Sequence, residues 1–373
     1  MATTTLAPAA SGSVTRSRAL PPRLSGRFGP NWYAAVMGTA IIGNGAHALP
    51  GSADHAWLTV GAACAWVLSL VMLTVLVATR LAARRHHDRV RAMDDPMTAV
   101  FFGCPPMAML AVGAGALGAG APVVGVRLGV ALDSALWVVG TLYGLALAAR
   151  VMYLLVAVFK VERAGCSPTW LLPVVAPMVS AALGPALIPH LPAGGQARET
   201  MLALCAALFG ASLLGVLVLL PGIWSRLVHE GPLPMTLVPT LFLVLGPLGQ
   251  SVTAVTAFAT DASAVSPALT APLHAFALLY GIPVIGFALL WLAVAGAVSL
   301  RGLRNGMPFA MTWWAYTFPV GTCVTGAAGL EKLTGLVMFD ALAVALFALL
   351  LAAWTVVAVR TARGLADGVL VAR

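Results

Sequence analysis

The sequence contains few charged residues. Asp, Glu, Lys and Arg make up 9% of its 373 residues and hydrophobic residues make up 60%, whereas a soluble domain carries about 25% charged residues. The mean hydropathy of +0.96 points the same way. This scarcity of charge excludes an ordinary soluble domain and predicts a polytopic integral membrane protein. The net charge of +9 then reflects where arginines lie relative to a membrane and does not indicate nucleic-acid binding.

Cysteine is also scarce, and the usual motifs of enzymes are missing. The five cysteines stand singly in apolar runs, without a CxxC motif or a Cys/His cluster, which indicates neither a disulfide framework nor a metal site. A nucleotide-binding GxxxxGKS/T loop and the catalytic motifs HExxH and GxSxG are absent from the sequence as well. We therefore expect no cofactor, no metal and no catalytic residues, and we predict that the protein is not an enzyme.

Long runs without charge follow a polar, basic segment, residues 1–27, that we expect to be a disordered cytoplasmic tail. A membrane-crossing helix needs about 20 apolar residues. We predict ten such helices in one transmembrane domain over residues 28–360, followed by a cytoplasmic tail over 361–373. The runs are 28–53, 56–79, 96–126, 134–159 (interrupted by Arg150), 164–197, 200–225, 231–260, 262–300, 305–330 and 341–359. We interpret 262–270 as an external loop.

Lysine and arginine are distributed unevenly between the predicted loops. If the N-terminus is cytoplasmic and ten helices alternate in direction, 17 basic residues lie inside and 3 outside, as the positive-inside rule favours. We therefore predict that both termini are cytoplasmic. The preference for Arg over Lys and the many alanines suggest a GC-rich bacterial genome, and hence a plasma membrane of the bacterial inner-membrane type.

The spans form a repeat of helical hairpins. The odd-numbered spans start near residues 31, 97, 168, 233 and 308, at spacings of 66, 71, 65 and 75 residues, which indicates five hairpins. Interior prolines concentrate in the odd spans. Because a proline leaves a carbonyl without a partner, which lipid cannot supply, we predict an all-α fold in which the odd helices form an inner ring and the even helices face lipid.

The ninth span, residues 307–330, has the composition of a pore wall. On a helix, Ala315, Phe318, Thr322, Thr325 and Gly329 share one stripe that is narrow, weakly polar and carries one bulky ring. A ring at this depth makes a dewetted constriction, which is one way to gate a channel. Phe318 is therefore the predicted gate, although a packed core ring would also explain it. The tryptophans just before it, at 313 and 314, are typical of an interfacial belt.

Other inner spans carry comparable stripes. Pro239, Leu243, Gly246, Gln250 and Thr253 share a face of the seventh span, where the amide of Gln250 suits a pore wall. His47 is a candidate proton relay, and a structural hydrogen-bonding role is the alternative. The full set of predicted pore-lining residues is Gly38, Thr39, Pro105, Pro177, Gly246, Pro247, Gln250, Ala315, Pro319, Thr322 and Thr325. Because no ring of acidic or basic residues accompanies them, this wall would pass small anions without binding them tightly.

Four stretches of the sequence resemble a known family. FGPNWYAAVMGTAII (28–42), TWLLPVVAPMVSAALG (169–184), PTLFLVLGPLGQS (239–251) and WWAYTFPVGT (313–322) are similar to the tellurite-resistance/dicarboxylate transporter family. That family includes bacterial tellurite-resistance proteins, slow-type anion channels, yeast malate permeases and sulfite efflux pumps, and the resemblance covers roughly residues 28–360. It implies five hairpins around a quasi-fivefold pore, a homotrimer with one pore in each protomer, and a phenylalanine on the ninth helix that blocks the pore, at the position of Phe318.

Two functions follow from the resemblance. One is a passive anion channel for chloride, nitrate, malate or sulfite, and the other is a proton-coupled transporter of C4-dicarboxylates, with sulfite export as a variant of either. Coupling requires a titratable group on the inner ring, for which His47 is the clear candidate. This shortage of titratable groups favours the uncoupled channel.

Overall fold

The computed structural model describes residues 28–82, 93–193, 195–368 and 370, so the predicted tail 1–27 lies outside the described residues. These residues form helices and loops, and none of them is in a strand. The long helices are α1 (Tyr33–Ala48), α2 (Ala56–Ala82), α5 (Cys104–Leu117), α7 (Val126–Tyr153), α8 (Leu171–Leu183), α9 (Ala197–His229), α10 (Leu245–Val265), α11 (Pro267–Arg304), α12 (Phe318–Thr334) and α13 (Val337–Ala366).

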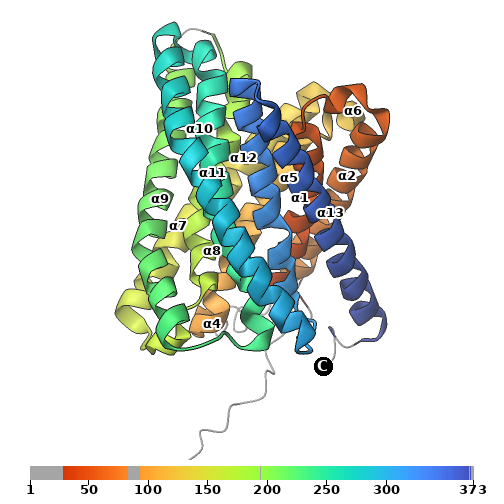
Figure 1. Ribbon diagram of the computed structural model, residues 1–373. Helices are drawn as coiled ribbons and strands as arrows, with labels where there is room; N and C mark the ends of the chain where they lie inside the picture. Colours follow the sequence, from red (N-terminus) through yellow and green to blue (C-terminus); the bar gives the residue numbers. More distant parts are fainter. Residues whose placement is uncertain (1–27, 83–92, 194, 369, 371–373) are drawn as a thin grey trace, which may run out of the picture.

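Short helical segments connect them. They are η1 (Pro30–Trp32), η2 (Ser52–Asp54), α4 (Pro96–Ala99), η3 (Val100–Gly103), α6 (Ala121–Val124), the π-helical η4 (Leu154–Val158), η5 (Arg163–Gly165), η6 (Pro168–Trp170), η7 (Gly184–His190), η8 (Met235–Val244) and η9 (Met311–Tyr316). In Figure 1, α4 and the C-terminal end of α13 lie at one end of the bundle, and α6 lies at the other.

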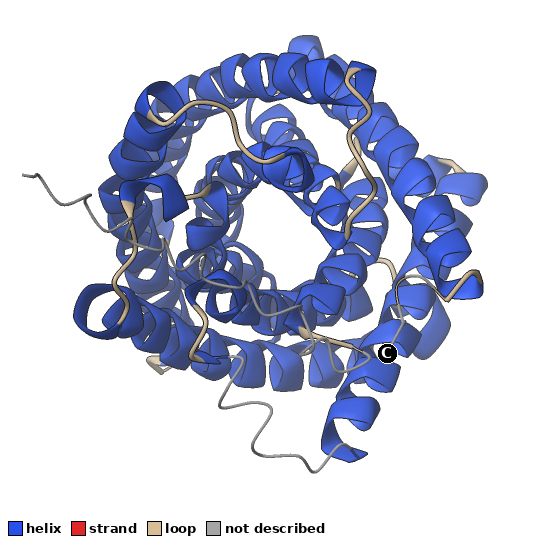
Figure 2. Ribbon diagram, turned by 90° about the horizontal axis from the view of Figure 1, so that it is seen from below, coloured by secondary structure: helices blue, strands red, loops and turns tan. Residues whose placement is uncertain are grey.

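The long helices pair as five hairpins and form two concentric rings. The pairs are α1 with α2, α5 with α7, α8 with α9, α10 with α11 and α12 with α13. The first member of each pair also packs against the first members of the neighbouring pairs, so that α1, α5, α8, α10 and α12 close a ring (Figure 2). This arrangement confirms the predicted fold of inner odd helices surrounded by outer even helices.

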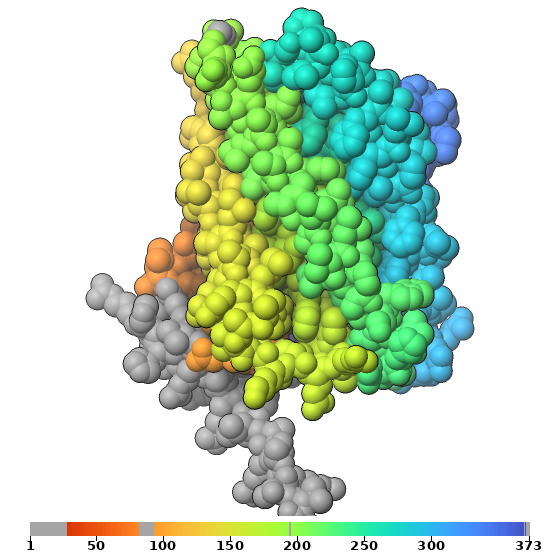
Figure 3. Space-filling model, turned by 90° about the vertical axis from the view of Figure 1, so that its left-hand side faces the viewer, coloured from red at the N-terminus to blue at the C-terminus, as the bar shows by residue number. Residues whose placement is uncertain are grey.

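Burial separates the two rings. In the most apolar stretch of the spans built on α5, α8 and α10, 78, 89 and 83% of the residues are buried, against 28–33% in the outer helices. The outer helices carry large exposed apolar side chains such as Leu142, Val218 and Leu279. Figure 3 shows one face of this surface, where α7, α9 and α11 lie side by side. Such a surface needs lipid to cover it.

Eight of the ten predicted membrane crossings are long enough to span a bilayer as single helical segments, and two are shorter. Eight of the helical segments among the described residues are long and apolar enough to span a membrane. The remaining two inner helices, α1 and α12, have 16 and 17 residues, and each is extended at its start by a 3-10 helix, η1 or η9. The external loop expected over 262–270 is wrong. Helix α10 continues to Val265 and α11 begins at Pro267, so Ser266 alone separates them. Pro267 is tolerated in α11 because it lies in the first turn.

The prolines of the inner helices act differently from the expected mid-helix kinks. Every inner α-helix is preceded by a 3-10 segment, and Pro105 and Pro319 lie in the first turn of α5 and α12. A first-turn residue has no intrahelical acceptor for its N–H, so a proline is tolerated there. Among the predicted pore prolines, Pro177 lies inside α8. Pro105 and Pro319 therefore mark where the inner wall changes from 3-10 to α-helix, whereas Pro177 does not.

Candidate functional site

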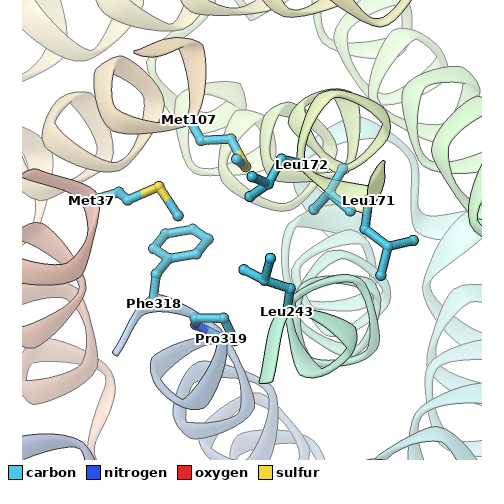
Figure 4. A pocket seen from close by; sticks show the side chains of 9 residues that line it. Met37, Met107, Leu171, Leu172, Leu243, Phe318 and Pro319 are labelled. Carbon is cyan, nitrogen blue, oxygen red and sulfur yellow. The ribbon is translucent and has the colours of Figure 1, made fainter. Parts of the chain in front are cut away.

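A constriction closes the inner ring near the start of its α-helices. The remaining space is about 20 Å³, which is about the volume that a single water needs. All five inner helices or their 3-10 extensions contribute to it, and every contributing side chain is apolar (Figure 4). The lining residues are Met37, Met107, Leu171, Leu172, Val175, Leu243, Gly246, Phe318 and Pro319. A site so narrow and apolar holds neither water nor an ion stably.

Phe318 supplies the largest side chain of this constriction. Its ring points into the space between the inner helices and lies beside Met37 (Figure 4), and its side chain is 2% exposed. The preceding residue holds the backbone in place, because the Thr317 hydroxyl donates to the carbonyl of Trp314 at 2.7 Å. Phe318 is the first residue of α12, and only Thr317 separates it from the end of η9.

Close packing holds α12 against both of its inner neighbours. A Cβ atom on Gly321 would lie 2.3 Å from Cγ1 of Ile41 in α1, and one on Gly249 of α10 would lie 2.5 Å from the backbone nitrogen of Cys323. Only glycine leaves room for contacts as close as these, with a side chain at Gly321 and with backbone at Gly249. The position of α12, which carries Phe318, is therefore fixed by a close glycine contact with α1 and another with α10.

A polar vestibule opens beyond the constriction, toward the C-terminal ends of the inner helices. Its volume is about 520 Å³. Four ionisable side chains line it, His47, Asp261, Glu331 and Lys332, together with the hydroxyl residues Thr253, Thr256, Thr260 and Thr325. Two carboxylates against one ammonium do not make a strongly positive cavity. Under the predicted topology, this vestibule faces the outside.

The hydroxyl groups of the vestibule are bonded to their own wall. Thr253 and Thr325 join α10 to α12 through a hydroxyl–hydroxyl bond of 2.8 Å. The hydroxyl of Thr325 also lies 3.0 Å from the carbonyl of Thr322, and Thr260 donates to the carbonyl of Thr256 at 2.9 Å. Because these donors are used by backbone carbonyls, the wall is wettable but offers few free donors to an anion.

Some of the predicted site residues line one of the two cavities, and the others line neither. Phe318, Gly246 and Pro319 line the constriction, and His47 and Thr325 line the vestibule. Neither of these two cavities is lined by the other predicted pore residues, Gly38, Thr39, Pro105, Pro177, Pro247, Gln250, Ala315 and Thr322.

Several of the predicted pore residues that line neither cavity make contacts between helices instead. The Thr39 hydroxyl accepts the indole N–H of Trp354 on the outer helix α13 at 3.1 Å. The Thr322 hydroxyl donates to the carbonyl of Leu245 on the neighbouring inner helix α10 at 3.3 Å. A Cβ atom on Gly38 would lie 2.9 Å from the ring of Trp314. Trp313 and Trp314 are also buried, each 3% exposed, so the expected interfacial belt is wrong for this pair, whose indoles bond within the protein.

Sequence reasoning missed most of the constriction and the charges of the vestibule. Met37, Met107, Leu171 and Leu243 look like ordinary core residues in the sequence. The signal that could have found them is the repeat, because each lies near the point where its inner α-helix begins. Asp261, Glu331 and Lys332 lie near the ends of α10 and α12, where charges also occur as ordinary loop residues.

A closed ring of inner helices with an axial constriction, a vestibule and a lipid-facing outer ring defines a membrane channel or transporter. Residues 27–362 match the family described as voltage-dependent anion channels, SLAC1, and the chain belongs to that family. This confirms the predicted resemblance. Members of the family are transporters or channels, so the protein is not an enzyme but transports anions across a membrane.

Similar proteins cover almost the same length. An uncharacterised transporter of Methanocaldococcus jannaschii is 24% identical over 350 residues, which is 92% of this chain and 96% of that protein. A sulfite efflux pump, SSU1, of Arthroderma otae is 27% identical over 88% of each chain. A sulfite efflux pump of Trichophyton rubrum is 26% identical over 84% of each.

Proposed function

We propose that this protein forms an axial pore for small anions and that Phe318 closes the pore. The observation that carries the proposal is the apolar constriction of about 20 Å³ to which all five inner helices contribute and into which the Phe318 ring points. An anion that loses its water in an apolar space pays a desolvation cost of several kcal/mol or more. Movement of one ring would therefore change the barrier from prohibitive to passable.

The surroundings of the constriction suit transport better than tight binding. No charged side chain lines the constriction, so an anion passing through it meets no ion pair that would retain it. The vestibule beyond it provides a volume of about 520 Å³ and an ammonium at Lys332. A permeation path needs sites that are weak enough to release the ion again.

Sulfite is the anion that the named relatives favour, because two of them are sulfite efflux pumps. Chloride, nitrate and malate remain within the proposed substrate class. We further propose a homotrimer in the plasma membrane, with both termini cytoplasmic, a transmembrane domain over residues 28–360 and flanking cytoplasmic tails. The arginine distribution between alternate loops supports this orientation.

The test is anion flux through purified protein in liposomes. Phe318→Ala should raise the flux of sulfite and chloride at least tenfold, because it removes the ring from the constriction. Phe258→Ala is the matched control: Phe258 is also 2% exposed, but it packs against Phe209 of the outer helix α9, with ring centroids 6.1 Å apart. If both variants leave the flux unchanged, or raise it equally, Phe318 is not the gate.

A proton-coupled dicarboxylate transporter is the second candidate. The observation in its favour is that His47 and Asp261 line the same vestibule, which supplies titratable groups on the path. Malate uptake would then require a pH gradient, and His47→Ala would abolish that requirement. Uptake that follows the membrane potential alone, with and without His47, would reject this candidate.

A further inference from the structure

Gln250 carries a polar group that the packing of the pore wall does not use. Its side chain is 1% exposed. The side-chain oxygen is buried and has no hydrogen-bond partner within the described part of the chain, and no hydrogen bond of its nitrogen is found there either. An unsatisfied buried amide lowers stability, so its presence in the core of the inner ring needs an explanation.

The position of Gln250 on α10 supplies one. Gly246, four residues before it, lines the constriction, and Thr253, three residues after it, lines the vestibule. Residues at these spacings lie above one another on one face of a helix. Gln250 therefore lies on the face of α10 that Gly246 and Thr253 share, at the level between the two cavities, although it lines neither of them.

We propose that Gln250 is a selectivity residue that binds the permeating ion, and that its preferred ligand is a singly protonated oxyanion such as hydrogensulfite. This inference rests on the proposed pore. A glutamine amide offers both an acceptor oxygen and an N–H₂ donor. A singly protonated oxyanion presents an O–H donor beside an anionic oxygen, so it can bond to both ends of the amide at once. Nitrate and chloride offer acceptors only and leave the Gln250 oxygen unpaired.

The neutral amide also fits the needs of conduction. The constriction next to it contains no charged side chain, and the nearest ammonium among the cavity-lining residues, Lys332, belongs to the vestibule. Hydrogen bonds from a neutral amide to an anion are strengthened by the charge of the anion but lack the attraction of a full ion pair. Gln250 would thus distinguish ions as they pass without trapping them.

The test compares Phe318→Ala with the double variant Phe318→Ala/Gln250→Met in liposomes, at a pH where sulfite is mostly singly protonated. Methionine keeps the length of the side chain and removes both hydrogen-bonding groups. We expect the ratio of hydrogensulfite to nitrate permeability to fall about tenfold, the equivalent of one to two hydrogen bonds, while nitrate flux itself stays within about twofold. Chloride serves as a second ion without a proton and should follow nitrate.

Thermal unfolding of the same proteins tests the premise. Replacing an unpartnered buried amide by an apolar side chain should leave the Tm unchanged or raise it, and Gln250→Leu provides a second apolar variant. If both apolar variants fail to fold, the amide has a structural partner and the inference is overturned. An unchanged permeability ratio, or an equal fall for all ions, also overturns it. Absence of any anion flux through Phe318→Ala overturns the proposed pore and this inference together.

Discussion

The indole N–H of Trp314 donates to the hydroxyl of Thr361 at 3.1 Å, and this bond ties η9 to the outer helix α13. The guanidinium of the neighbouring Arg360 lies 4.7 Å from the centre of the Trp313 ring, within the range of a cation–π contact. Two consecutive residues of α13 thus hold two consecutive residues of η9. Because η9 is followed after one residue by Phe318, the outer ring positions the proposed gate.

Thr361→Val should loosen this attachment. It leaves the buried Trp314 indole without an acceptor, which costs about 1 kcal/mol or somewhat more. We expect a lower Tm together with a higher basal anion flux, because η9 would hold Phe318 less firmly.

Thr355→Val is the control for this change. Thr355 also lies on α13, but it is exposed and its hydroxyl bonds only to the carbonyl of Leu351 within its own helix. The same substitution there should change neither the Tm nor the flux by a measurable amount. Equal effects at both positions would show that α13 does not position η9.

Gly249→Ala should disrupt the contact between α10 and α12. The added methyl carbon would lie 2.4 Å from the Thr322 hydroxyl oxygen and 2.5 Å from the backbone nitrogen of Cys323, so the two helices must move apart. Overpacking of this kind costs about 1–3 kcal/mol. The expected result is a lower Tm in detergent and a reduced yield of folded protein.

Gly286→Ala provides the matched comparison. Gly286 lies on the exposed face of α11, and nothing lies within 4 Å of the added methyl carbon. Alanine also favours a helix over glycine by about 1 kcal/mol, so this variant should be as stable as the parent or more stable. A Gly249→Ala protein with an unchanged Tm would refute the close approach of α10 and α12.

Charge substitutions in the vestibule should change anion flux in opposite directions. Asp261→Asn removes a negative charge from the vestibule and Lys332→Gln removes a positive one. For anions that enter from the vestibule, we expect the first to raise the flux a few-fold and the second to lower it by a similar factor, since local potential changes ion concentration. Both effects should shrink as ionic strength rises, because salt screens exposed charges.

Asp54→Asn separates this local effect from a change in net charge. Asp54 is exposed in η2 and is not among the residues that line the vestibule. It should leave the flux within experimental error at all salt concentrations. If Asp54→Asn and Asp261→Asn act alike, the vestibule is not on the path of the ion.

The sequence alone was sufficient to predict the architecture. Scarcity of charge predicted a membrane protein, and the repeat of spans with prolines concentrated in the odd ones predicted the inner ring that α1, α5, α8, α10 and α12 form. These features are visible in one dimension because the bilayer imposes the same requirement on every span: each must be long, apolar and internally hydrogen-bonded. The sequence also singled out Phe318, which lines the constriction, because it is the one bulky ring on a stripe of small residues. Its role as the gate stays a prediction.

Tertiary structure decided which residues face the axis. Methionine and leucine side chains fill both the helix contacts and the constriction, so Met37 and Leu243 could not be told from core residues until five helices closed around them. The same closure placed Thr39 and Thr322 in helix contacts and brought Asp261 and Lys332 into one vestibule. A helical stripe defines a direction relative to its own axis, and only the packing of the other helices determines whether that direction points to lipid, to a neighbour or to the pore.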